Sequence, residues 1–255
     1  MNNTIARRPE ASDADVLSAA RRRLLSWKFE LRALVARHPT LEPLYRLAVW
    51  WTQYKVRDHI DVRECRVGPE TEFVLDGFQG SANTFATVAF KRSQSRPVRI
   101  AHHLHAPAQI IKAVERNLPT LVTIRRPADT VLSLTSRWPY ITVPQALRNY
   151  TRFYQTIAPY APGFVLSPFD QTTGHLDHVI EAVNRRFGTD FDLFEHTEEN
   201  VQALRGSPGA NDRPASRRAE IKARKAEVLN REACQRLLRR ADAVYEQLLP
   251  YGVGR

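Results

Sequence analysis

The sequence predicts an α/β fold, a parallel β-sheet flanked by helices, with a helical segment in front of it. From Glu72 onward, short apolar runs rich in strand-forming residues alternate with segments of helical periodicity. This alternation is typical of βα units, whose parallel strands are covered by helices on both faces. A chain of 255 residues is long enough for one such domain and a smaller accessory part.

The N-terminal part, residues 1–70, is predicted to be a helical segment packed on the main domain. Apolar residues recur at roughly helical spacing between Asp13 and Ile60, and the sequence His38-Pro39-Thr40 interrupts them. A second helix is expected to follow through Leu44, Leu47, Trp51 and Tyr54.

Residues 71–255 are predicted to form the α/β domain. The strand candidates are FVLDG, VRIAHH, TLVTIR and GFVLSPF, with helices expected after Thr84, Pro107 and Pro127 and from about Val143. The polar stretch from Arg205 to Ser216 is typical of a loop, and one basic helix is expected from about Arg217 to Leu249. Ligands of such sheets bind beyond the carboxyl ends of the strands.

Charge and composition narrow the functional classes. The formal net charge of +11 and the pI of about 10.1 favour anionic partners such as phosphate or sulfate groups. The two cysteines are too few for a disulfide framework or a metal cluster. No apolar run reaches the eighteen or so residues of a membrane span, and the N-terminus lacks an apolar signal core, so we expect a cytoplasmic protein.

The stretch FVLDGFQGSANTFA (residues 73–86) has the layout of a phosphate-binding loop between a strand and a helix. Backbone N–H groups at a helix N-terminus attract anions, and Ser81, Asn83 and Thr84 offer further donors. The loop departs from the GxxxxGK[ST] nucleotide motif at two of its four fixed positions, including the lysine. On the loop alone, an anion site and a plain strand-to-helix turn remain open.

A second segment, TLVTIRRPADTVLSLTSR, places Arg125 at the end of a strand and Ser133 two turns into the following helix. These two side chains are expected to bind one phosphate from two sides. The alternative is an arginine that pairs with an acid near the strand end.

Together the two segments resemble the nucleotide-dependent sulfotransferases, which transfer a sulfuryl group from 3′-phosphoadenosine 5′-phosphosulfate (PAPS) to a hydroxyl or amine. In that family P-[KR]-S-G-T-T-W binds the 5′-phosphosulfate and R-x-P-x-D-x-x-x-S binds the 3′-phosphate. Arg125, Pro127, Asp129 and Ser133 match the second motif at every fixed position, and QGSANTF (79–85) is similar to a P-R-S-A-N-T-F variant of the first.

The resemblance covers about residues 72–187 and implies a P-loop NTPase-like three-layer sandwich with PAPS as co-substrate and no metal. The residues implied in PAPS binding are Gly80, Ser81, Ala82, Asn83, Thr84, Phe85, Arg125 and Ser133. The acceptor is expected to be a small molecule, a carbohydrate or a lipid, and no nucleic-acid motif is found.

The histidines of IAHHLHAPAQI lie where the family has K-T-H-L-P, so that His105 falls on the general base and His103 on the lysine. Histidine is well suited to take a proton from an attacking hydroxyl near neutral pH. Alternatively, His102, His103 and His105 ligate a metal or face solvent, and the metal is the least favoured.

The chain departs from the family at Gly80, where the loop normally carries a lysine or arginine that stabilises charge on the leaving phosphate. Three explanations are open: another cation replaces it, the enzyme is slow, or the domain binds nucleotide without turnover. We favour replacement, by His103, Arg125, Lys91, Arg92 or the late basic segment. In the late basic segment, Arg217 and its basic neighbours correspond in position to the family's R-K-G region. A solvated, basic face of a helix explains these charges equally well.

Two other functions stay open. An ATP-dependent phosphoryl transferase would need acidic metal ligands, for which Asp76 and Asp170 are the only tempting residues. A catalytically weak nucleotide-binding protein that associates with membrane surfaces is favoured by LYRLAVWWTQYKVR (44–57), which mixes aromatic and basic residues as interfacial helices do.

Overall fold

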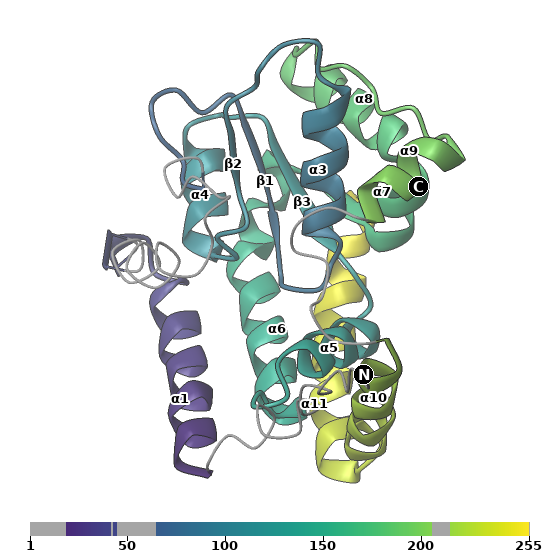
Figure 1. Ribbon diagram of the computed structural model, residues 1–255. Helices are drawn as coiled ribbons and strands as arrows, with labels where there is room; N and C mark the ends of the chain where they lie inside the picture. Colours follow the sequence, from purple (N-terminus) through teal and green to yellow (C-terminus); the bar gives the residue numbers. More distant parts are fainter. Residues whose placement is uncertain (1–18, 42, 45–64, 206–214, 255) are drawn as a thin grey trace, which may run out of the picture.

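The computed structural model describes residues 19–41, 43–44, 65–205 and 215–254. A four-stranded, entirely parallel sheet in the order β2-β1-β3-β4 lies at its centre, which confirms the α/β fold (Figure 1). The strands are β1 (Phe73–Gly77), β2 (Ile100–His102), β3 (Thr120–Ile124) and β4 (Val165–Pro168). Each lies within one of the four apolar runs that the sequence marked as strands. The expected second helix through Trp51 and Tyr54 lies outside the described residues.

Helices cover both faces of the sheet. On one face, α3 (Asn83–Ser93) and α8 (Leu176–Phe187) pack on Phe73, Leu75 and Leu121. On the other face, α4 (Pro107–Glu115) and α6 (Val143–Ile157) pack with Val122 and Ile124. Side chains alternate between the two faces of a strand, so the nearly continuous apolar sequence of β3 supplies both cores.

The starts of three helices follow local sequence signals. Proline stands at the first position of α4 and of α5 (Pro127–Arg137), where its missing N–H has no intrahelical partner to lose. At α6, Thr142 and Gln145 form a reciprocal capping box. These starts place α4 and α5 directly after the ends of β2 and β3.

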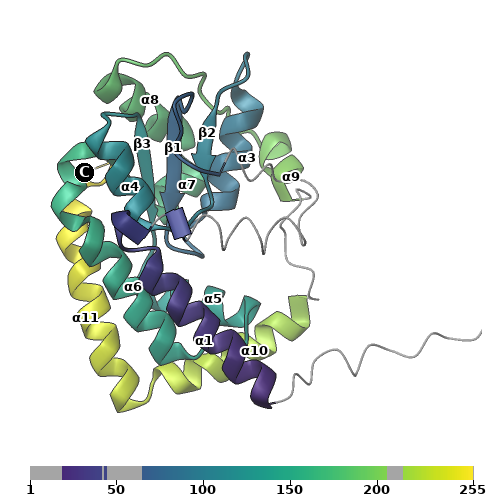
Figure 2. The ribbon, with the colours of Figure 1, turned by 90° about the vertical axis from the view of Figure 1, so that its left-hand side faces the viewer.

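The remaining helices are α7 (Phe169–Gly174), α9 (Glu198–Arg205), α10 (Ala215–Leu229) and α11 (Glu232–Leu248), with short 3-10 turns at Pro39–Leu41, Ala158–Gly163 and Leu249–Tyr251. The single basic helix predicted from Arg217 to Leu249 is wrong, because the chain turns at Asn230 and Arg231. The turn lets α10 pack against α5 while α11 packs along α6, two directions that one straight helix cannot follow (Figures 1 and 2).

The first described helix, α1 (Ala19–Val35), lies beside α6 beyond the carboxyl ends of the strands (Figure 2). Its attachment is slight: Phe29 packs on the core and the Ser26 hydroxyl bonds the Gln145 amide oxygen at 2.9 Å. No residue of α1 is itself buried. Four large side chains remain exposed on it, namely Leu24, Trp27, Leu31 and Leu34. Within the described residues, no helix combines the length and apolar character needed to cross a bilayer.

Candidate functional site

The two predicted anion-binding segments leave the same edge of the sheet from neighbouring strands. β1 and β3 pair directly, with Gly77 opposite Thr123, and the loop and Arg125 follow these positions. Gly80 lies against α5: a Cβ placed on it would be 3.3 Å from the Thr130 carbonyl oxygen and 3.7 Å from the Ser133 hydroxyl oxygen. The loop and the segment carrying Ser133 are therefore in contact.

The loop turns through left-handed backbone at two residues, with φ of 94° at Gly80 and 75° at Ala82. The amides of Gly80 and Ala82 have no hydrogen-bond acceptor within the described part of the chain. The first amides of α3, which starts at Asn83, have no intrahelical partner either. Successive unpaired N–H groups in such a turn form a concavity suited to an anion.

Ser81 and Asn83 hold this loop from inside, and their side chains are buried. The Ser81 hydroxyl bonds the Phe78 carbonyl at 2.5 Å and the Thr123 hydroxyl at 3.0 Å. The Asn83 amide nitrogen donates to the same Phe78 carbonyl at 3.0 Å, and its oxygen accepts from Thr123 at 2.9 Å. The expectation that these two side chains offer donors to a ligand is thus corrected, because their polar atoms are engaged within the protein. Thr84 is only half-buried.

Two tyrosines of α6 fix the strand ends beneath the loop. The Tyr154 hydroxyl donates to the Thr123 carbonyl at 2.8 Å and accepts from the Phe78 amide at 3.3 Å. The Tyr150 hydroxyl donates to the Arg125 carbonyl at 2.8 Å. Burial raises the pKa of both phenols well above the usual range, so both remain neutral donors. Both rings are fully buried, so they support the strand ends from inside the core and do not face a pocket.

His105 is held by backbone and by a buried carboxylate. Its Nδ1 lies 2.8 Å from the Gly77 carbonyl oxygen and 3.3 Å from Oδ1 of Asp76. A carbonyl oxygen only accepts, so Nδ1 carries the proton and the neutral ring has its lone pair on Nε2. Asp76 is fixed in turn, because its carboxylate accepts from the His105 amide at 2.9 Å and the Gly77 amide at 2.9 Å. This arrangement is suited to a general base.

His103 links the neighbouring histidine to the loop. Its Nε2 lies 3.1 Å from the Thr84 hydroxyl, and its Nδ1 lies 2.8 Å from Nδ1 of His102. His103 and His105 both have left-handed backbone, with φ of 57° and 52°. Such strain in non-glycine residues is concentrated at functional sites. His102 and His103 direct Nδ1 at each other, whereas His105 directs Nδ1 at the Gly77 carbonyl. Within the described residues these three histidines do not form a cluster of ligand atoms, and the predicted metal alternative gains no support from this geometry.

His102 makes the stability of the fold depend on pH. Burial, helped by Lys91 and His105, lowers its pKa from 6.5 to about 3. Between these values the unfolded chain binds a proton that the folded chain does not, so stability falls as pH decreases below 6.5. We expect the free energy of unfolding of wild type, relative to that of His102→Gln, to fall by about 2 kcal/mol from pH 7 to pH 5.

Urea unfolding at the two pH values measures this difference, with His178→Gln at an exposed histidine as the control. If the stabilities of wild type and His102→Gln changed with pH in parallel, the pKa of His102 would not differ between the folded and unfolded states.

Arg125 follows β3 and stacks on an aromatic ring. Its guanidinium carbon lies 3.9 Å from the centre of the Phe169 ring in α7. Its Nε is buried and has no hydrogen-bond partner in the described part of the protein. A buried donor without a partner is rare in folded proteins and is often explained by a missing ligand. Arg125 thus stacks on α7 directly after β3, with one buried donor that no described residue accepts from.

The other predicted contributors are placed differently. The Phe85 ring packs against Phe194, so only its backbone remains near the loop. Lys91 and Arg92 are in the last turn of α3, the end away from the loop, and Arg92 bonds the Ala203 carbonyl. Arg217 is exposed in the first turn of α10, and α10 packs mainly on α5. Of the sequence's candidates for a replacement cation, His103 contacts Thr84 after the loop, and Arg125 follows β3, the strand paired with the one that leads into the loop.

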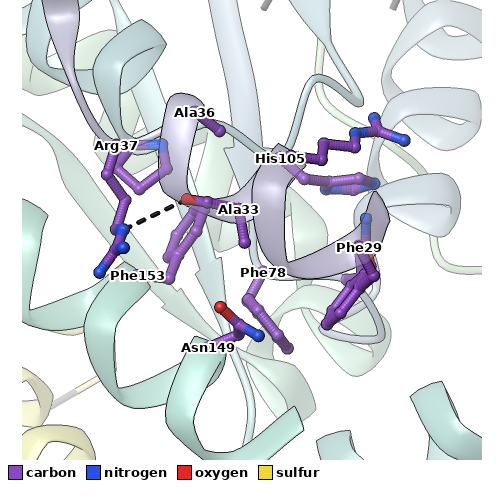
Figure 3. Close-up of a pocket in the computed structure, with 11 residues that line it drawn as sticks. Phe29, Ala33, Ala36, Arg37, Phe78, His105, Asn149 and Phe153 are labelled. Carbon is purple, nitrogen blue, oxygen red and sulfur yellow. Dashed lines mark hydrogen bonds between the residues drawn. The ribbon is translucent and has the colours of Figure 1, made fainter. Parts of the chain in front are cut away.

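A pocket opens beside His105 on the α1 side of the loop (Figure 3). It is lined by Phe29, Arg32, Ala33, Ala36, Arg37, Phe78, Gln79, His105, Pro107, Asn149 and Phe153. The sequence analysis missed the α1 residues and the role of Asp76. α1 is separated from the loop by more than forty residues, and Asp76 at the end of its strand was considered only as a metal ligand.

Comparisons with known proteins identify no relative: no protein-family model, no curated protein and no solved structure matches this chain. Its function must therefore be inferred from the residues of the site.

Proposed function

We propose that the protein is a sulfotransferase that uses PAPS as donor and a hydroxyl compound as acceptor. The observation that carries the proposal is the pairing of His105 with buried Asp76 next to a loop that contacts the Arg125 and Ser133 segment. A base and two anion-binding elements thus share one edge of the sheet. The resemblance of residues 72–187 to the sulfotransferases supports the same assignment.

In the proposed reaction, the acceptor oxygen attacks the sulfur of PAPS while Nε2 of His105 removes the hydroxyl proton. A new oxygen–sulfur bond forms, and the bond between sulfur and the 5′-phosphate oxygen breaks. That oxygen keeps the electron pair and leaves with adenosine 3′,5′-bisphosphate. The amides of Gly80, Ala82 and the first turn of α3 would stabilise its charge. The proton on His105 is then released to solvent.

The cation missing at Gly80 is proposed to be replaced by His103 and Arg125. The hydroxyl of Thr84, in the first turn of α3, lies 3.1 Å from His103 Nε2. A hydrogen bond donated by His103 in this region would stabilise charge on the leaving phosphate, and the guanidinium of Arg125 would supply the full positive charge. The left-handed conformation of Gly80 explains why the position itself carries no side chain.

The alternative of an ATP-dependent phosphoryl transferase has less support. Both oxygens of Asp76 accept backbone N–H groups, and this carboxylate is buried, so it is not presented as a metal ligand. Asp170 is exposed in the first turn of α7. Neither acid stands in the arrangement that Mg²⁺-dependent phosphoryl transfer requires.

Binding tests this proposal before any acceptor is known. Adenosine 3′,5′-bisphosphate should raise the melting temperature, and Arg125→Gln should weaken its affinity by roughly thirtyfold, because a charge-assisted contact to phosphate is lost. Arg126→Gln, next in sequence and exposed, is the matched control and should bind like wild type. A melting temperature raised by ATP with magnesium and unchanged by the bisphosphate would favour the phosphoryl transferase instead.

Association with membrane surfaces is a second candidate function, which the exposed side of α1 favours. Leu24, Trp27, Leu31 and Leu34 are exposed there, and Arg21, Arg22, Arg23 and Lys28 are exposed on the same helix. Helices of this composition bind anionic lipid surfaces. We expect the protein to float with vesicles containing phosphatidylserine and to lose most of this binding in Trp27→Ser/Leu31→Ser. If wild type and Trp27→Ser/Leu31→Ser floated equally, α1 would not be the surface that contacts the vesicles.

A further inference from the structure

The pocket beside His105 combines an apolar surface with positive charge. Three phenyl rings line it, those of Phe29, Phe78 and Phe153. Among the described residues, the lining side chains that are always charged are Arg32 and Arg37, both from the N-terminal helical segment, and none of the lining side chains is acidic. A pocket of this composition is complementary to an apolar molecule that carries a negative charge.

Arg37 is the better defined of the two arginines. Its Nε donates to the Ala33 carbonyl at 3.2 Å, which fixes the start of the guanidinium group while its remaining N–H donors are left for other partners. Partial burial and the nearby charge of Arg152 lower the pKa of Arg37, and Glu30 opposes this effect. A bound anion would offset the poor solvation of this charge.

We propose that the acceptor is a hydroxylated acid with a flat apolar body, whose hydroxyl lies at His105 and whose anionic group lies at Arg37. In Figure 3, Arg37 lies on one side of the lining residues and His105 on the other, with Ala33 between them and Phe78 and Asn149 below. The hydroxyl and the acid must therefore stand at opposite ends of the molecule. The role of this compound as acceptor rests on the proposed sulfotransferase activity, but its binding does not.

A ring enters this pocket only if α1 moves. The space left between the lining side chains is about 30 Å³, which is less than a phenyl ring needs. We expect α1 to be the wall that moves, because none of its residues is buried, whereas Ala36 just after it is held by the Ala108 amide. The pocket is thus expected to open with α1 as its moving wall.

Three probes of similar shape and different charge test the proposal: 4-hydroxyphenylacetate, its neutral amide, and the cationic tyramine. Calorimetry on the full chain without nucleotide should show the acid binding at least about tenfold more tightly than the amide, with tyramine weakest. In Arg37→Gln the difference between acid and amide should fall below about threefold. Arg116→Gln, which replaces an exposed arginine at the end of α4, should keep the wild-type preference.

Equal binding of the three probes, binding of none, or a preference unchanged in Arg37→Gln would each overturn the proposal. A separate assay with radiolabelled PAPS distinguishes it from the proposed function. Selective binding of the acid without sulfated product would leave the pocket assignment in place and refute the sulfotransferase. Sulfation of all three phenols at similar kcat/KM would support the sulfotransferase and refute the pocket assignment.

Discussion

Replacing His105 by alanine should lower kcat for sulfuryl transfer by about 10²- to 10⁴-fold, the range expected when a general base is removed. Affinity for adenosine 3′,5′-bisphosphate should stay within about twofold of wild type, because the imidazole faces the acceptor pocket and not the loop amides. Rates with a hydroxyl acceptor and calorimetry with the bisphosphate measure the two effects separately.

Imidazole added to the buffer should restore part of the lost rate in His105→Ala, since it supplies the missing base. His175→Ala, which removes an exposed histidine, is the control and should be fully active. If His105→Ala retained the wild-type rate with intact folding, the proton would be taken by another group and the proposed mechanism would fail.

Replacing Gly77 by alanine should destabilise the fold by about 3 kcal/mol or more, because it overpacks a buried site. A Cβ at this position would lie 2.5 Å from the Thr123 hydroxyl, closer still to the Thr123 carbonyl, and 3.1 Å from the Ser81 hydroxyl. These atoms belong to rigid backbone or to the network that holds the loop. The change should therefore also displace the Gly77 carbonyl that fixes Nδ1 of His105.

Gly68→Ala is the matched control, since a Cβ there meets no atom within 4 Å. It should change the free energy of unfolding by less than about 1 kcal/mol in urea titrations. Equal stability of the two variants would mean that the end of β1 can move away from β3, against the close packing of these two strands.

The sequence was informative where a local pattern determines the structure. The four apolar runs became the four strands, and proline marked the starts of α4 and α5. The pairing of β1 with β3 brings the loop next to Ser133, as the resemblance to the sulfotransferases implied.

Features that depend on tertiary contacts were not predictable from the sequence. Ser81 and Asn83 look like exposed donors in a motif, but Thr123, forty residues away, turns them inward. Tyr150 and Tyr154 look like pocket aromatics, but their hydroxyls cap the ends of β3. The part that α1 plays in the pocket has no sequence signal at all, because only folding brings it next to His105.

The geometry of Gly80 limits how this loop can be engineered. Grafting a lysine at that position, which would bring the loop closer to the sulfotransferase motif, would force a side chain into left-handed backbone. Its first carbon would also crowd a carbonyl oxygen of α5. A cation in this loop would therefore have to come from a neighbouring position whose backbone is not left-handed.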